Sequence, residues 1–289
     1  MDLRFISVPG IARSKRHALL RVTAAAGLLT LTGESAQSAT INTQWNFDDA
    51  ASGASAVANV GGHVGTFIGG VSRSANTEGV SGTPGDYALS LSGAAGGAGS
   101  MMDATTPDFI AALNSLTGTQ VMSITYWQNL NAITNSTSFW GVSPSVGRGL
   151  NAHSPWGDGN AYYDTAGCCA AGVHRLSGPL GATIGEWELI SLIYDNGTKS
   201  IYRGTTLIAS GSGFTPLVTD HTNFYVSNES PTHTLNPEGR FDNFTLWNGA
   251  LSTAEIAALA VRPVPEPSAA GFAAAAALLG TFRRRRVVR

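Results

Sequence analysis

WELISLIYDNGTKSIY, residues 187–202, predicts a β-hairpin and through it the fold. Apolar residues recur along both halves of this stretch, and Asp195, Asn196 and Gly197 separate the halves. A tight turn between antiparallel strands needs residues that tolerate positive φ, and the Asn-Gly pair meets that need. The stretch therefore indicates an antiparallel sheet, because only antiparallel strands can be joined by so short a connection.

Other parts of the chain alternate in the same way. In residues 121–130, Met122, Ile124 and Tyr126 face one side and the residues between them face the other, which is the period of a strand. Further strands are predicted at residues 41–47, 87–93, 137–142, 205–210, 222–228 and 239–249. Short strands at this spacing predict an all-β domain in which two antiparallel sheets pack face to face, a jelly-roll sandwich.

Helix is expected at only two places in the body of the chain, residues 108–116 and 251–260. The second begins with Ser252 and has Glu255 three residues later, which is the pattern of a capping box. Loops are expected at two stretches rich in Gly, Ser and Ala, residues 50–62 and 70–85.

The composition excludes several classes of protein. Charged residues make up 12% of the chain and there are 35 glycines, which does not suit a disordered chain or a helical bundle. Residues 40–262 hold 7 basic and 16 acidic residues, a net charge of −9, whereas basic residues cluster near both ends. A domain that binds nucleic acid needs a basic face, so we expect no nucleic-acid partner.

The N-terminal residues have the three-part order of a secretory signal peptide. A basic stretch ends at Arg21, an apolar run follows at residues 22–33, and Ala36 and Ser38 stand like the −3 and −1 residues of a cleavage site. Cleavage after Ala39 fits nearly as well. The chain is therefore expected to have three parts. These are a signal peptide at 1–39, one domain at 40–262, and a sorting and transmembrane segment at 263–289.

The third part reads PVPEPSAAGFAAAAALLGTFRRRRVVR and ends in a cluster of arginines. Its apolar stretch, residues 268–282, would give a helix of about 22 Å at about 1.5 Å per residue. A bilayer core needs roughly 20 residues. We therefore expect an apolar helix outside the domain that meets the membrane transiently, with Arg283–Arg286 at its cytoplasmic end.

Residues 153–164, HSPWGDGNAYYD, are the candidate ligand site. Aromatic rings stack on the C–H faces of sugars, and carboxylates and amides bind their hydroxyls. The ligand-binding candidates are Trp156, Asp158, Asn160 and Tyr162. The alternative is a tight loop between strands whose Trp side chain fills the sandwich, with His153 packed or solvated.

Cys168 and Cys169 are the only two cysteines of the chain. Two thiols do not make a structural zinc site. Adjacent Cα atoms lie about 3.8 Å apart, below the usual span of about 4.4–6.8 Å for disulfides. In an oxidising exterior we expect a vicinal disulfide that closes an eight-membered ring and rigidifies the loop. Free thiols and pairing between molecules are the alternatives.

Glu186 and Glu188 form the only close glutamate pair, and they are the candidates for glycoside hydrolysis. Retaining hydrolysis needs two carboxyl groups about 5 Å apart. We interpret the pair instead as two carboxylates that face solvent at a strand edge, and none of the nucleophile-elbow, zinc-protease or phosphate-loop motifs occurs in the sequence. We expect a domain without catalytic residues.

Five blocks of sequence resemble concanavalin A-like lectin/glucanase domains, and in particular the laminin-G-like jelly rolls of bacteria. They occur in the family's order and begin QWNFDD, YALSLSG, ITYWQNL, GEWELISLIYDNGTKSIY and GRFDNFTLWNGALSTAEI. The resemblance spans roughly residues 43–260, and its last two blocks are the most specific. It implies the jelly-roll fold that the strand pattern predicts.

The same resemblance implies one structural calcium ion. Such domains often hold it with an acidic side chain near the first strand and another on the last strand, and calcium prefers oxygen ligands. The matching residues are Asp48, with Asp49 beside it, and Asp242. Ordinary turn and strand-edge aspartates remain the alternative. The loop AAGGAGS at 94–100 departs from the family, which often has Asp or Asn there.

The C-terminal part resembles a PEP-CTERM sorting signal. The motif is Pro265, Glu266 and Pro267, followed by the apolar stretch and the arginine cluster. Such a signal implies an exosortase, a membrane enzyme of Gram-negative bacteria that make exopolysaccharide, as a processing partner. It implies export across the inner membrane to the cell envelope, cell surface or extracellular matrix.

Together these features predict an exported, non-catalytic binding or adhesion protein that contacts exopolysaccharide or a surface glycan. A glycan-cleaving enzyme of the same fold and a purely structural matrix protein are the alternatives.

Overall fold

A computed structural model describes residues 38–50 and 52–262. Nearly all of the predicted signal peptide and the whole of the predicted sorting segment, with its motif Pro265, Glu266 and Pro267 and its apolar helix, lie outside the described residues. Within the described ranges, no helix has the length and apolar character needed to cross a membrane.

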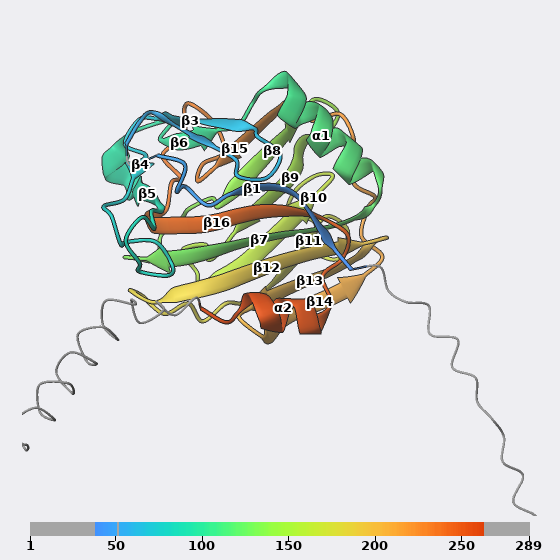
Figure 1. The fold of residues 1–289 in the computed structure, drawn as a ribbon. Coiled ribbons are helices and arrows are strands. Elements are labelled where there is room, and N and C mark those ends of the chain that lie inside the picture. The colour runs from blue at the N-terminus through green and yellow to red at the C-terminus, as the bar shows by residue number, and fades with distance from the viewer. Residues whose placement is uncertain (1–37, 51, 263–289) are drawn as a thin grey trace, which may run out of the picture. The chain divides into compact units, whose positions relative to one another are not determined.

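The described residues form two antiparallel eight-stranded sheets that pack as a sandwich (Figure 1). Sheet A has the order β14 (Thr206–Ser212), β13 (Thr198–Arg203), β12 (Trp187–Asp195), β7 (Val121–Leu130), β16 (Glu238–Asn248), β5 (Leu89–Ser92) and β4 (Ser72–Arg73), and β1 (Thr40–Trp45) also pairs with β16. Sheet B has the order β11 (Arg175–Pro179), β10 (Asn160–Thr165), β9 (Gly147–His153), β8 (Phe139–Ser143), β15 (Asn223–Val226), β6 (Met101–Asp103), β3 (Val64–Ile68) and β2 (Ser55–Val57). The all-β, two-sheet prediction is confirmed.

The hairpin predicted from residues 187–202 is present as β12 and β13. Asp195 pairs with Thr198, so Asn196 and Gly197 alone make the turn. Both have positive φ, 45° and 83°. This is the backbone conformation for which an Asn-Gly pair is suited, because such a turn matches the twist of the two strands.

The core lies between the sheets and is rich in aromatic rings. From β7, Met122, Ile124 and Tyr126 point into it, as the alternation predicts. Phe244 of β16 stacks on Tyr126 with 5.5 Å between the ring centroids. The other face of β7 is buried too, since Ser123, Thr125 and Trp127 on that face are all buried. The central strand therefore has two buried faces.

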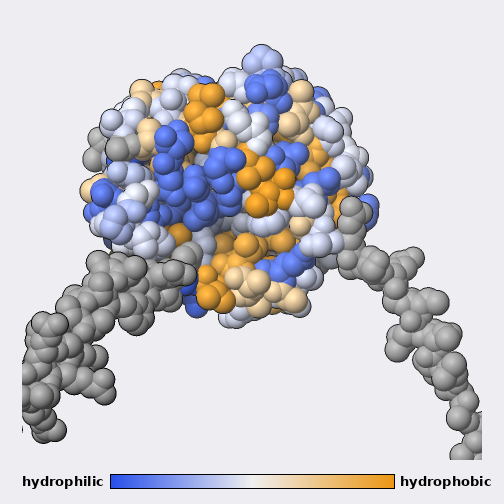
Figure 2. Space-filling model, viewed as in Figure 1, coloured by the Kyte–Doolittle hydropathy of each residue, from blue (hydrophilic) through white to orange (hydrophobic). Residues whose placement is uncertain are grey.

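Two α-helices occur among the described residues, α1 (Pro107–Gly118) and α2 (Thr253–Leu259), where helix was predicted. The capping box of α2 is formed, since Ser252 accepts the Glu255 N–H and the Glu255 carboxylate accepts the Ser252 N–H. Figure 2 shows apolar surface gathered beside α2, where a groove between the helix and sheet A is lined by Trp127 and Trp247.

The loop predictions need correction. Residues 50–62 contain β2, and residues 70–85 contain β4. Strands β3, β6, β9, β10 and β11 were also not predicted. Their sequences are short or rich in glycine and polar residues. Gly149 of β9 shows why a glycine stands in such a strand. A Cβ at this position would lie 2.4 Å from Nε2 of the His221 imidazole, so a larger residue would clash with that ring.

Candidate functional site

A cavity of about 310 Å³ lies on the outer face of sheet B. It is called the sheet B cavity below. It is lined by Arg148, His153, Trp156, Asp158, Tyr162, Cys169, Arg175, Glu229 and Leu235. These residues come from β9, β10, β11 and the loops at their ends, together with the loop between β15 and β16. Segments far apart in the sequence thus meet in one concave surface.

The strand register explains why these side chains share a face. His153 pairs with Tyr162, and Asp164 pairs with both Asn151 and Arg175. The residues between them, such as Tyr163, point into the core. Because side chains alternate along a strand, the polar residues of β9, β10 and β11 stand together on the outer face.

Three of the four predicted ligand-binding residues line this cavity. Trp156 is half-buried and packs edge-on against the His153 ring, with 4.7 Å between the centroids. Asp158 accepts hydrogen bonds from the Tyr162 hydroxyl at 2.5 Å and from the Asn160 N–H at 2.9 Å. The Tyr162 bond, followed by those from Asn160, lowers the pKa of Asp158. Asn160 is thus the one predicted residue that supports the cavity without lining it.

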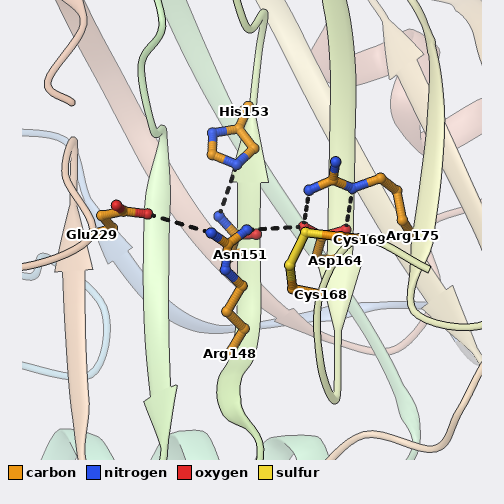
Figure 3. The surroundings of a disulfide bond; sticks show 8 residues. All are labelled: Arg148, Asn151, His153, Asp164, Cys168, Cys169, Arg175 and Glu229. Carbon is orange, nitrogen blue, oxygen red and sulfur yellow. Dashed lines mark hydrogen bonds and ion pairs between the residues drawn. A yellow bond between two sulfur atoms is a disulfide. The ribbon is translucent and has the colours of Figure 1, made fainter. Parts of the chain in front are cut away.

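Two arginines that the sequence did not single out hold a buried carboxylate at the floor of the cavity (Figure 3). Asp164 is completely buried. Arg175 donates to it from Nε at 2.7 Å and from Nη2 at 2.6 Å, and Arg148 approaches it at 3.4 Å. The hydrogen bonds to Asp164 raise the pKa of Arg175. A forked pair of this kind fixes both the charge and the position of the guanidinium.

The arginines also orient the aromatic rings. The guanidinium of Arg175 lies 4.4 Å from the centroid of the Tyr162 ring, and that of Arg148 lies 4.2 Å from the Trp140 ring. Arg148 further pairs with Glu229 at 3.7 Å. Cation–π contacts hold such planar groups in stacked positions. The rings and cations of the cavity are therefore preorganised.

His153 is a packed residue at the back of the cavity. Its Nδ1 lies 2.9 Å from the Ser136 carbonyl oxygen and 3.4 Å from the Thr137 hydroxyl. Burial lowers its pKa to about 4. The neutral ring therefore donates from Nδ1 to the carbonyl and supports Trp156 and Tyr162 from behind.

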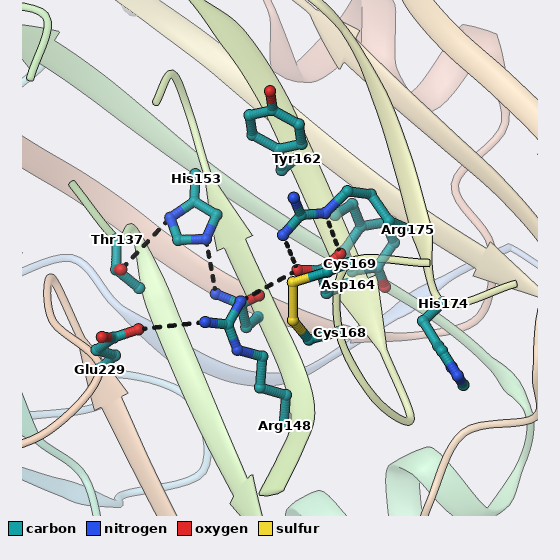
Figure 4. Close-up of polar contacts among 12 residues, drawn as sticks. Thr137, Arg148, His153, Tyr162, Asp164, Cys168, Cys169, His174, Arg175 and Glu229 are labelled. Atoms are coloured by element: carbon teal, nitrogen blue, oxygen red, sulfur yellow. Dashed lines mark hydrogen bonds and ion pairs between the residues drawn. A yellow bond between two sulfur atoms is a disulfide. The ribbon is translucent and has the colours of Figure 1, made fainter. Parts of the chain in front are cut away.

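A disulfide joins Cys168 to Cys169, and Cys169 lines the cavity (Figure 4). Figures 3 and 4 show this disulfide beside Arg148, Asp164 and Arg175. The sequence could suggest the bond, since the two cysteines have no other partner in the chain. It gave no signal that the bond would face the candidate ligand residues.

Comparison with known proteins identifies the family. A laminin-G-type family model, described as the concanavalin A-like lectin/glucanases superfamily, matches residues 103–257, more than half of the chain. The chain belongs to the concanavalin A-like lectin/glucanases superfamily. A search of curated proteins found no significant match.

Solved structures share the fold of this concanavalin A-like domain. One is domain 4 of AbnA, an extracellular arabinanase of Geobacillus stearothermophilus, in complex with arabinotriose; it has 16% identity and a TM-score of 0.57, over 78% of this chain and 100% of that one. Another is the sialidase of Trypanosoma rangeli in complex with sialic acid, with 14% identity and a TM-score of 0.54, over 76% of this chain. The chain spans 32% of the sialidase. Identities this low show the fold alone.

The two aspartates expected to bind calcium in this concanavalin A-like domain lie near each other. Asp48 accepts the Tyr87 N–H at 2.8 Å, and Asp242 accepts the Val80 N–H at 2.8 Å. Burial raises the pKa of Asp242 well above its ordinary value, and the charges of Asp86 and Asp48 raise it further. In the described ranges, however, no three His, Cys, Asp or Glu side chains come together as a metal site. Calcium stays a prediction.

The glutamate pair lies apart from the sheet B cavity. Glu188 is in β12 of sheet A, where its Oε1 accepts the Thr183 N–H at 3.0 Å and lies 3.4 Å from Nη1 of Arg203. Glu186 precedes the strand and is exposed. Glu188 thus has a structural partner in the concanavalin A-like domain.

Proposed function

We propose that this protein is a non-catalytic carbohydrate-binding protein that uses the sheet B cavity to hold a segment of a polysaccharide. The observation that carries the proposal is the convergence of Trp156 and Tyr162 with Arg148, Arg175 and Asp158 on one concave surface. Saccharide sites combine aromatic faces with a few precisely placed polar groups. The superfamily, and a fold shared with an arabinanase domain that holds arabinotriose, support the same class of ligand.

Each lining group has a role in this proposal. The half-buried Trp156 ring offers a face to the C–H groups of a pyranose or furanose ring. Arg175 uses Nε and Nη2 for Asp164, which leaves Nη1 to donate to a hydroxyl. Asp158, exposed at the rim, accepts from hydroxyl groups. Because the protein already fixes these groups, binding needs little further ordering of side chains.

The hydrogen bonds of the carboxylates support binding over hydrolysis. Glycoside hydrolysis uses one carboxyl group as acid and a second as base or nucleophile. In the cavity, Asp164 is shut off from solvent and held by two arginines, and Glu229 pairs with Arg148 and His233. Both carboxylates are paired with cations, so we assign them the role of holding the arginines in position.

We further propose that the protein is exported and sorted to the cell envelope or extracellular matrix. The signal peptide at 1–39 would direct export, and an exosortase would process the segment at 263–289. A polysaccharide ligand suits a protein that works in that matrix.

The test presents the full-length protein to a glycan array that includes arabinotriose and other neutral and acidic oligosaccharides. The same sugars are then incubated with the protein and assayed for new reducing ends. We expect binding to at least one class of glycan and no release of reducing ends. Release of reducing ends would show the glycan-cleaving alternative, and the absence of binding to any glycan would favour a structural matrix protein.

A further inference from the structure

The loop between β10 and β11 forms one wall of the sheet B cavity. It spans residues 166–174, is called the disulfide loop below, and carries Cys168 and Cys169. Cys169 is exposed and lines the cavity with Tyr162 and Arg175 (Figure 4). The bond between the sulfur atoms is therefore within reach of anything bound there.

The base of the disulfide loop is fixed to the sandwich. The Gly167 N–H donates to the Arg148 carbonyl at 2.7 Å, which ties the loop to the strand that carries this arginine. At the other end, Nζ of the buried Lys199 donates to the His174 carbonyl at 2.6 Å. The disulfide lies between these anchors, where the loop turns over the cavity.

The backbone of the loop adopts conformations that residues with side chains rarely take. Ala166 has a φ of 51° and Cys169 a φ of 71°, in the left-handed region that favours glycine. Such conformations persist where the surroundings enforce them. For Cys169 the covalent bond to its neighbour is one such constraint, since it closes a small ring around the peptide bond. Breaking the bond would release this constraint.

We propose that the Cys168–Cys169 disulfide is part of the ligand-binding surface, and that reducing it weakens binding in the sheet B cavity. The inference rests on the carbohydrate-binding function proposed above. The ring offers a rigid, polarisable sulfur edge in the same cavity as Tyr162, and the apolar side of a sugar packs against this edge. Two free thiols leave the loop able to rearrange and remove that edge.

The reduction balances with an external dithiol as the reductant. A thiolate of the dithiol attacks Sγ of the exposed Cys169, and Cys168 leaves as a thiolate that takes up a proton. The second thiolate of the dithiol then closes its own disulfide and releases Cys169, which is protonated in turn. Two electrons pass from the dithiol to the protein, and the S–S bond becomes two S–H bonds. An oxidising exterior keeps the bond intact.

The test compares the oxidised full-length protein with protein reduced by dithiothreitol, using the glycans that bind on the array as probes. We expect reduction to weaken affinity by about tenfold or more, and reoxidation to restore it. The C168A/C169A variant should bind as weakly as the reduced protein and be indifferent to dithiothreitol. It is a clean control because the chain has no other cysteine.

A second measurement needs no ligand. Amide hydrogen exchange in residues 166–174 should rise on reduction, while exchange in β7 stays unchanged. Equal affinity of the oxidised and the reduced protein, with both thiols shown to be free by mass, would overturn the inference. If no probe binds the oxidised protein, the carbohydrate-binding proposal fails. The inference, which concerns binding in this cavity, then fails with it, whereas binding that reduction leaves unchanged contradicts the inference alone.

Discussion

Asp164 and Arg175 lie opposite each other in the pairing of β10 with β11, and two hydrogen bonds of 2.7 and 2.6 Å join their side chains. The carboxylate is completely buried, whereas the guanidinium reaches the sheet B cavity. A structural contact of the sheet is thus also the floor of the candidate binding site. Changes to this pair are expected to affect both stability and binding.

Replacing Arg175 by alanine should lower the free energy of unfolding by on the order of 3 kcal/mol, because it leaves a buried carboxylate with only the longer contact to Arg148. Arg175→Lys keeps the charge but loses the forked geometry, and should recover only part of the loss. Urea denaturation of the three proteins measures both effects. A loss below about 0.5 kcal/mol for Arg175→Ala would show that the pair does not stabilise the sheet.

Acid should destabilise the protein through two buried histidines. Burial lowers the pKa of His153 to about 4 and that of His221 to about 4, from an ordinary value of 6.5. Between pH 4 and pH 6.5 the unfolded chain therefore binds more protons than the folded protein does. Their contribution to stability is complete above pH 6.5 and is lost as the pH falls toward 4. NMR titration of the two imidazoles checks this, and a midpoint near 6.5 for either ring would contradict it.

The capping box of α2 should contribute about 1 kcal/mol to stability. Ser252→Ala removes the side chain that accepts the Glu255 N–H, whereas Ser252→Thr retains a hydroxyl there and serves as the matched control. We expect the alanine variant alone to lose stability in thermal denaturation. Equal melting of both variants and the wild type would mean that α2 does not unfold together with the sandwich.

Glu255 adds a pH dependence to the same helix. Hydrogen bonds from Ser252 and Ser38 lower its pKa from 4.5 to about 2. A lowered pKa in the folded state means that the contribution is complete above pH 4.5 and disappears as the pH falls to about 2. The difference in stability between the wild type and Glu255→Gln should shrink over that window. A constant difference would indicate that the charge of Glu255 is not involved.

How much of this could be predicted from the sequence depends on the distance over which each feature is encoded. The β12–β13 turn and the capping box rest on residues within a few positions of one another, and both were predicted. Trp156, Asp158 and Tyr162 lie in one short stretch, and the sequence predicted them as parts of one ligand site. These features are local in the chain.

Arg148 and Arg175 were missed because only the register of β9, β10 and β11 brings them to Asp164. Their strands were missed for a related reason. Asn151 and Asp164 are buried polar residues, so the alternation of apolar with polar residues that marks an ordinary strand is absent. The pairing between strands cannot be predicted from the spacing of residues along the chain. The residues at the floor of the cavity are brought together by that pairing, so the sequence did not reveal them.

Calcium should stabilise the protein at neutral pH if Asp48 and Asp242 hold it, as the family resemblance predicts. Because the pKa of Asp242 is raised in the folded state, its carboxyl group costs stability once the pH rises through that pKa. A bound cation would offset this cost. Calcium should therefore raise the melting temperature at pH 7 and have little effect at pH 4, and Asp242→Asn should abolish the response. A melting temperature at pH 7 that changes neither with calcium nor with a chelator would contradict the calcium prediction.

The central claim is that the sheet B cavity binds carbohydrate, and the affinity of Trp156→Ala for a glycan that binds the wild type tests it most directly. Trp187→Ala is the matched control, since Trp187 is a half-buried tryptophan that lines a different pocket, on sheet A. Isothermal titration should show that Trp156→Ala binds tenfold or more weakly, a loss of about 1.4 kcal/mol, and that Trp187→Ala binds as the wild type does. Unchanged affinity in Trp156→Ala would contradict the assignment of the site.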